Sequence, residues 1–145
     1  MLVACKRAVR HPVTVPPIHR RPGDSTAHGR SVRLPIPELV SELRDALGAK
    51  LVAYLGGVRE TRAVRQWADG ERTIQNGDQE RRLRLAHQLT AIITGRDSGA
   101  VAGAWFQGLN PDLADRSPAR MLREGDLDEV GPQVLSAARA FAAGP

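Results

Sequence analysis

The sequence is poor in cysteine and has no long apolar run. Cys5 is the only cysteine, so no intramolecular disulfide bond can form, and no Cys/His pair has the spacing of zinc ligands. The first twelve residues contain too few apolar residues, and are too interrupted by Lys6, Arg7 and Arg10, to form a signal peptide. No apolar segment approaches the length that spans a membrane. We therefore expect a cytoplasmic protein without a disulfide framework, a structural metal or a membrane anchor.

Aromatic residues are also scarce, at 3% of the chain, although hydrophobic residues make up 41%. The apolar material is therefore mainly alanine, leucine and valine, which favours packed helices over a β-sandwich of branched and aromatic strands. A length of 145 residues suits one domain or two very small ones. These features predict an all-α fold, a compact multi-helix domain with a tail.

The formal charge of +5 is unevenly distributed along the chain. Residues 1–33 hold seven basic residues and one acidic residue, a net charge of +6, so the remaining residues carry a net charge of −1. Within the remainder, residues 48–85 carry a net charge of +3 and residues 96–145 a net charge of −2. A basic middle and an acidic end predict two surfaces with different partners.

Residues 1–34 contain four prolines and little apolar periodicity, so we expect a disordered basic arm. Such an arm either strengthens attraction to phosphates in a salt-dependent way or is a dispensable extension. The pattern then divides the chain into residues 35–75, which resemble a helix-turn-helix, and residues 76–145, which form further helices.

Helical spacing and glycine stops predict two short helices, at about residues 49–55 and 60–69, after a first helix near residues 37–47. Ala53 and Gly57 have the spacing of a helix-turn-helix, because a small residue and a glycine let the helices cross closely. The apolar anchors Val64 and Trp67 are three residues apart but one residue late in register. If the segment is a helix-turn-helix, the exposed face of its second helix, near residues 60–69, contacts DNA. The alternative is that these polar residues form the solvated face of an ordinary amphipathic helix. The expected DNA contacts are Arg59, Thr61, Arg62, Arg65 and Gln66.

A long helix follows at about residues 77–95, with Asn76 and Gln79 in capping-box relation and His87 in a structural, hydrogen-bonded role. Ser98 is placed to begin a helix of small residues. In the last helix, the interior Pro132 predicts either a kink or a new start at residues 131–132.

The segment WFQGLNPDLADRSPARMLREG, residues 105–125, has a distinctive order. A tryptophan ends a helix, an Asn-Pro turn has a leucine two residues later, a Ser-Pro opens a short helix, and a glycine and an apolar helix follow. This order resembles the toxin-binding domain of the Xre/MbcA/ParS family of antitoxins. The resemblance extends over the preceding helices, from Pro35 to Ala143. The matching residues are Trp105, Asn110, Pro111, Leu113, Ser117, Pro118, Leu122, Gly125 and Val130.

The resemblance implies a protein that neutralises a RES-domain toxin, an NAD-degrading enzyme, by covering its active site with the C-terminal half. It also implies repression of the protein's own operon through operator DNA. Many relatives have glycines in the loop that here contains Asp112, Ala114, Asp115 and Arg116, so the loop conformation is open. The acidic residues of the C-terminal half could face basic groups of the toxin, and residues 138–145 could plug its site. The residues expected to bind the toxin are Trp105, Asn110, Pro111, Leu113, Pro118, Leu122 and Phe141.

Two other functions fit part of the pattern. A free-standing helix-turn-helix regulator would bind DNA and no toxin, and a pure interaction module would bind the toxin and no DNA. An enzyme is not expected, because the sequence has no paired-carboxylate motif, no Gly-rich phosphate loop and no nucleophile with a histidine nearby in sequence. We expect no cofactor, and a homodimer that uses the small-residue helix at 99–107 as a packing surface.

Overall fold

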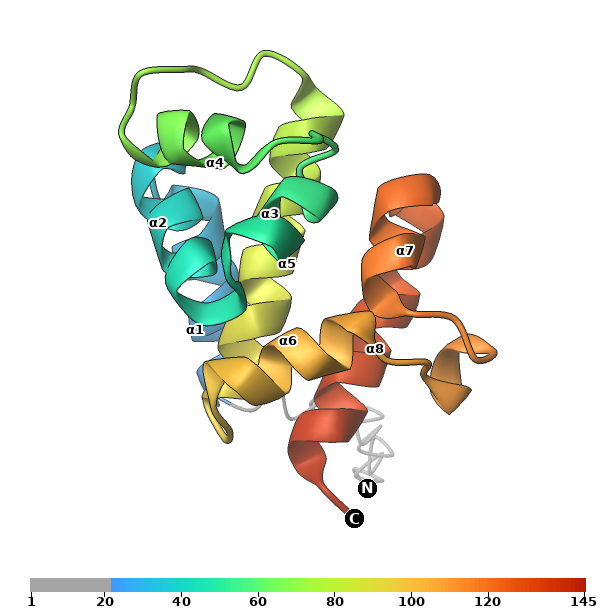
Figure 1. The fold of residues 1–145 in the computed structure, drawn as a ribbon. Helices are drawn as coiled ribbons and strands as arrows, with labels where there is room; N and C mark the ends of the chain where they lie inside the picture. Colours follow the sequence, from blue (N-terminus) through green and yellow to red (C-terminus); the bar gives the residue numbers. More distant parts are fainter. Residues whose placement is uncertain (1–21) are drawn as a thin grey trace, which may run out of the picture.

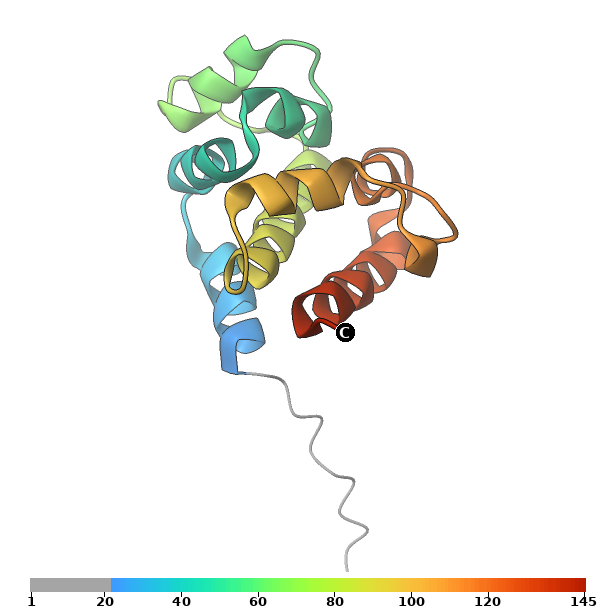
Figure 2. The same ribbon diagram turned by 60° about the horizontal axis from the view of Figure 1, so that its bottom comes forward.

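The computed structural model describes residues 22–145, and within this range the chain is helical and contains no β-strand. Figure 1 shows α1 to α4 on one side of the long helix α5 and α7 and α8 on the other, with α6 crossing α5 and packing against both α2 and α5. Figure 2 shows the same two groups from below. The elements are α1 (Pro22–Arg33), α2 (Ile36–Leu47), α3 (Ala49–Leu55), α4 (Thr61–Ala68), α5 (Gly77–Thr94), α6 (Gly99–Gln107), the 3-10 helix η1 (Pro111–Leu113), α7 (Pro118–Glu124) and α8 (Leu127–Ala143). The all-α prediction is confirmed.

The central helix α5 holds the two groups together. Its residues Leu83, Ala86 and Leu89 are fully buried, and it packs against α1, α2, α3, α6 and α8. Asn76 caps it by accepting hydrogen bonds from the backbone N–H groups of Asp78 (2.9 Å) and Gln79 (3.4 Å). The Gln79 side chain does not complete a capping box, because its amide donates to the Gly56 carbonyl at the end of α3. The Asn76 half of the expected capping box is therefore present, whereas the Gln79 side chain links α5 to the end of α3 instead.

The prediction of a disordered arm over residues 1–34 is wrong for residues 22–33, which form α1. This helix lies against α5, where Ala27 and Ser31 are buried. Arg84 of α5 donates hydrogen bonds to the carbonyls of Ser31 (2.8 Å) and Leu34 (2.9 Å), which satisfies the end of the helix. These partners are about 50 residues away in the chain, so local composition could not reveal them. Residues 1–21, the rest of the predicted arm, lie outside the described residues.

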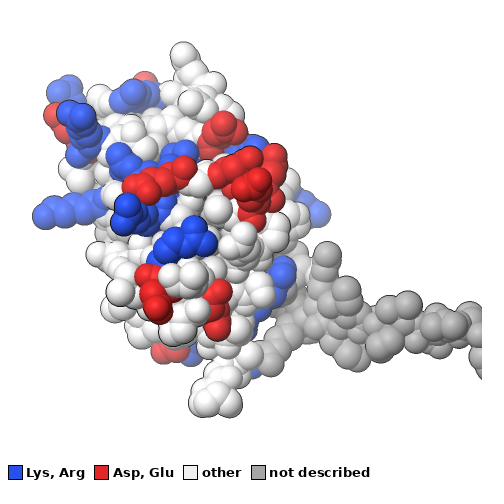
Figure 3. Space-filling model, turned by 90° about the vertical axis from the view of Figure 1, so that its right-hand side faces the viewer, with Lys and Arg blue, Asp and Glu red and all other residues white. Residues whose placement is uncertain are grey.

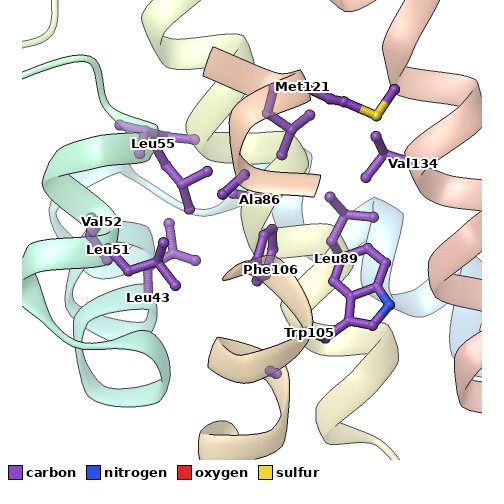
Figure 4. Packing of buried hydrophobic residues seen from close by; sticks show 14 of the residues in the cluster. Leu43, Leu51, Val52, Leu55, Ala86, Leu89, Trp105, Phe106, Met121 and Val134 are labelled. Carbon is purple, nitrogen blue, oxygen red and sulfur yellow. The ribbon is translucent and has the colours of Figure 1, made fainter. Parts of the chain in front are cut away.

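One hydrophobic core joins the helices of residues 35–75 to those of residues 76–145. Figure 4 shows Leu43, Val52 and Leu55 facing Phe106 of α6, with Met121 and Val134 beyond it. The small residues of α6 serve this core, since a Cβ atom on Gly99 would lie only 2.7 Å from the Ala46 carbonyl oxygen of α2. The face of α6 that was expected to form a dimer is thus largely used inside the molecule.

Helix α8 runs without interruption from Leu127 to Ala143 and includes Pro132. The predicted new start at residues 131–132 is therefore wrong. Asp126 caps the helix by accepting a hydrogen bond from the Asp128 N–H (3.0 Å). Pro132 lies in the second turn and is exposed, so the carbonyl that lacks its usual partner, that of Asp128, belongs to the first turn and can be solvated. No helix within residues 22–145 combines the length and apolar character needed to cross a membrane.

Candidate functional site

Helices α3 and α4 cross closely through a glycine turn. Gly57 has a φ of 73°, a left-handed conformation that favours glycine, and it follows directly on the end of α3. The ring of Trp67 lies against Gly56, where an added Cβ atom would come within 2.8 Å of it. Val64 and Trp67 are both buried, so the anchors pack inward as predicted despite their unusual register.

The outer face of α4 presents most of the residues that the sequence assigns to DNA. Arg59, Thr61, Arg62 and Arg65 are exposed, whereas Gln66 is only half-exposed. Within residues 22–145 none of the three arginines forms an ion pair, so their charges face solvent. A further arginine that sequence reasoning missed, Arg72, lies 6.0 Å above the ring of Trp67. The predicted residues therefore share one accessible face, with Gln66 at its edge.

A groove of about 670 Å³ lies between α6, the segment 108–112 and α8. Trp105, Asn110, Pro111 and Phe141, four of the seven residues expected to bind the toxin, line it. The other three are Leu113, Pro118 and Leu122, and all three are buried in the core of this chain. The assignment of these three to a partner surface is therefore wrong, because their side chains already pack against their own protein. These three residues stabilise the fold of the chain itself.

Two exposed apolar side chains flank the groove. Leu109 is 75% exposed and Phe141 is 44% exposed. The ring of Phe141 lies 6.5 Å from that of Trp105, which in turn meets Phe106 edge-to-face at 5.2 Å. Sequence reasoning missed Leu109, because its exposure depends on how α6 and α8 pack rather than on its neighbours in sequence. The groove is thus an apolar surface that no other described residue of the chain shields from solvent.

The loop at the edge of the groove is held in an unusual backbone conformation. Ala114 and Asp115 have φ values of 55° and 58°, left-handed conformations that normally favour glycine. The Asn110 side chain accepts a hydrogen bond from the Asp112 N–H (2.9 Å), and the Asn110 N–H donates to the Arg116 carbonyl (3.2 Å). These two hydrogen bonds hold the turn although neither Ala114 nor Asp115 is a glycine.

The acidic residues of the C-terminal half do not converge on one site. Asp112 lines the groove, whereas Asp126, Asp128 and Glu129 lie at the opposite end of α8, about 20 Å from Phe141 at the rise of a helix. Asp128 is paired with Arg81 at 2.6 Å. Figure 3 shows basic and acidic side chains interspersed on the side of the molecule that carries α7 and α8. The expected acidic surface is therefore divided and partly neutralised.

A serine, a histidine and a glutamate form a chain beneath α1. Ser31 Oγ lies 2.6 Å from His87 Nδ1, and His87 Nε2 lies 2.6 Å from Glu42 Oε2, which also pairs with Arg30. The Ser31 hydroxyl also lies 2.8 Å from the Ala27 carbonyl, to which it can donate, and Ser31 is only 2% exposed. This geometry favours a positioning role that ties α1 to α2 and α5. It agrees with the structural role predicted for His87.

This chain of contacts predicts a pH dependence of stability. Hydrogen bonding from Arg30, with a smaller contribution from His87, holds the pKa of the Glu42 carboxyl below its ordinary value of 4.5. A carboxyl with a lowered pKa stabilises the fold above the pKa of the unfolded chain and loses that effect as pH falls through the lowered value. We expect Glu42→Gln to reduce the loss of melting temperature below about pH 4.5. Thermal melts of both proteins from about pH 6 to pH 3 test this, and parallel profiles would contradict it.

Comparisons of the chain with protein-family models, with curated proteins and with solved structures give no match. Among the described residues, no group of three or more histidine, cysteine, aspartate or glutamate side chains is placed to hold a metal ion. Function is therefore inferred from the residues and their geometry.

Proposed function

We propose that this protein is the antitoxin of a toxin–antitoxin pair, which binds a RES-domain, NAD-degrading toxin and neutralises it by covering its active site. The observation that carries the proposal is the groove between α6 and α8, because residues of the antitoxin-like segment line it and leave Leu109 and Phe141 exposed. Exposed apolar residues around a hollow are typical of protein-binding surfaces. The protein itself performs no chemistry in this proposal.

The residues after α8 support the same assignment. Gly144 and Pro145 line the groove together with Phe141, so the last turn of α8 and these two residues belong to one continuous surface. A toxin that binds this surface would bury Leu109 and Phe141 and would contact residues 144–145 at the same time. Neutralisation then follows from steric exclusion of the dinucleotide substrate, and the acidic residues of the distant end of α8 are not needed.

Co-expression with the product of the adjacent gene tests the proposal. We expect this protein to rescue growth and to form a complex that is stable in size-exclusion chromatography. Leu109→Asp and Phe141→Asp should abolish both effects, because each places a charge in an apolar interface. Val32→Asp is the matched control, since Val32 is a 56% exposed apolar residue on α1, outside this groove. Failure of the wild-type protein to rescue growth and to form the complex would contradict the proposal. Groove variants that still rescue growth would also contradict it.

We propose as a second activity that α4 binds operator DNA and represses the operon. The supporting observation is the exposure of Thr61, Arg62 and Arg65 on α4, and of Arg59 just before it, where this short helix follows α3 through a glycine turn. Arginine side chains on such a helix can contact phosphates and base edges. DNA binding without toxin binding would instead indicate a free-standing regulator, and toxin binding without DNA binding a pure interaction module.

A further inference from the structure

The indole N–H of Trp105 has no hydrogen-bond acceptor among the described residues. Trp105 is only 8% exposed, and its Nε1 atom is buried. A buried N–H group normally has a partner, because the group has given up its hydrogen bonds to water. Trp105 is thus a polar group in the groove that the fold leaves unsatisfied.

The unsatisfied nitrogen lies on the side of the groove. Figure 4 shows the nitrogen of the Trp105 ring turned toward α8, away from Phe106. On that side lies Phe141, whose ring centre is 6.5 Å from that of Trp105 and which is itself partly exposed near the end of α8. Because Nε1 is buried in the free protein, a contact between it and a partner requires the groove wall around Trp105 to rearrange on binding.

We propose that Trp105 is a specificity-determining residue that donates a hydrogen bond from Nε1 to a backbone carbonyl of the toxin. In the complex, this toxin carbonyl lies next to an apolar side chain of the toxin, and that side chain enters the groove between Leu109 and Phe141. This inference rests on the proposed function, and it adds the chemistry that the partner must present. A neutral acceptor fits better than an anion, because Asp112 lines the groove.

The same charge argues against a second copy of this chain as the occupant. A two-fold contact through the groove would bring an Asp112 carboxylate from each copy into one interface, and like charges in an interface repel. A toxin segment without acidic residues meets no such repulsion. The groove therefore fits a partner that presents an apolar residue and an unpaired carbonyl.

The indole N–H signals of the ¹⁵N-labelled protein test the inference. The chain has two tryptophans, so Trp67→Phe assigns the signal of Trp105. On addition of the adjacent gene product, we expect the Trp105 signal to move downfield and its exchange with solvent to slow. Trp105→Phe keeps the apolar ring and removes the donor, and it should weaken the complex about fivefold to tenfold. Trp67→Phe is the matched control, because Trp67 Nε1 is also buried without an acceptor but lies on α4.

The outcomes separate this inference from the proposed function. If the wild-type protein forms no complex, the proposed function fails. If it forms a complex in which the Trp105 signal is unmoved, or if Trp105→Phe binds as tightly as wild type, the hydrogen bond is wrong and the groove assignment stands. A Trp105 signal that moves with protein concentration in the absence of toxin would overturn the inference in favour of a second copy. The signal of the wild-type complex decides the matter even if Trp105→Phe folds poorly.

Discussion

Phe106→Ala is expected to lower the free energy of unfolding by about 3–5 kcal/mol, the largest effect of any single substitution proposed for this protein. Phe106 is completely buried in α6 and packs edge-to-face on Trp105. Removing its ring takes apolar surface out of the core and leaves a cavity between α5 and α6. Because small domains are stable by only about 5–15 kcal/mol, the variant should be close to unfolding at 37 °C. Urea denaturation of both proteins measures the difference.

The only other phenylalanine of the chain provides the matched control. Phe141 is 44% exposed at the end of α8, so Phe141→Ala should cost about 1 kcal/mol or less. The same substitution should weaken toxin binding strongly, because Phe141 flanks the groove. Equal losses of stability for the two variants would mean that α6 does not pack on the core as described.

Joint substitution of Arg62→Glu and Arg65→Glu is expected to weaken binding to the operator by about 100-fold or more, since each contact of this kind contributes about 1–3 kcal/mol. Both arginines are exposed on α4 and neither forms an ion pair with another described residue, so the change should leave the fold intact. Electrophoretic mobility shift with the promoter fragment measures the loss. The dependence of affinity on salt should also become shallower.

Arg96→Glu is the control for charge alone. Arg96 is exposed in the turn after α5, about 25 Å from the start of that helix, which lies beside α3. Arg96→Glu should change the affinity for the operator only slightly. Toxin binding should be unaffected in Arg96→Glu and in the Arg62→Glu, Arg65→Glu double variant. Operator binding that survives the double substitution would show that α4 does not read DNA.

Local sequence signals predicted most helices and their ends. Asn76, Ser98 and Ser117 each accept a backbone hydrogen bond at the start of the helix they were expected to begin. Such signals work because a cap involves groups only two or three residues apart. The helix of residues 22–33 gave no comparable signal, because its stabilising partners Arg84 and His87 lie on α5.

The candidate site was predicted less completely than the fold. The order of residues in the segment 105–125 did not separate Trp105 and Pro111, which line the groove, from Leu113 and Leu122, which are buried. That distinction depends on how α6, η1, α7 and α8 pack together. The exposed Leu109 and the unsatisfied Trp105 nitrogen are also consequences of packing.

The sequence by itself determined the helical class and the basic residues of α4, because periodicity, caps and composition act over a few neighbouring residues. Only the tertiary structure decided that Gly99 brings α6 against α2 and that Ser31, Glu42 and His87 meet beneath α1. It also decided which apolar residues of the C-terminal half remain exposed. The physical reason is that burial and hydrogen-bond satisfaction depend on groups that are distant in the chain, and these meet only when the whole core has formed.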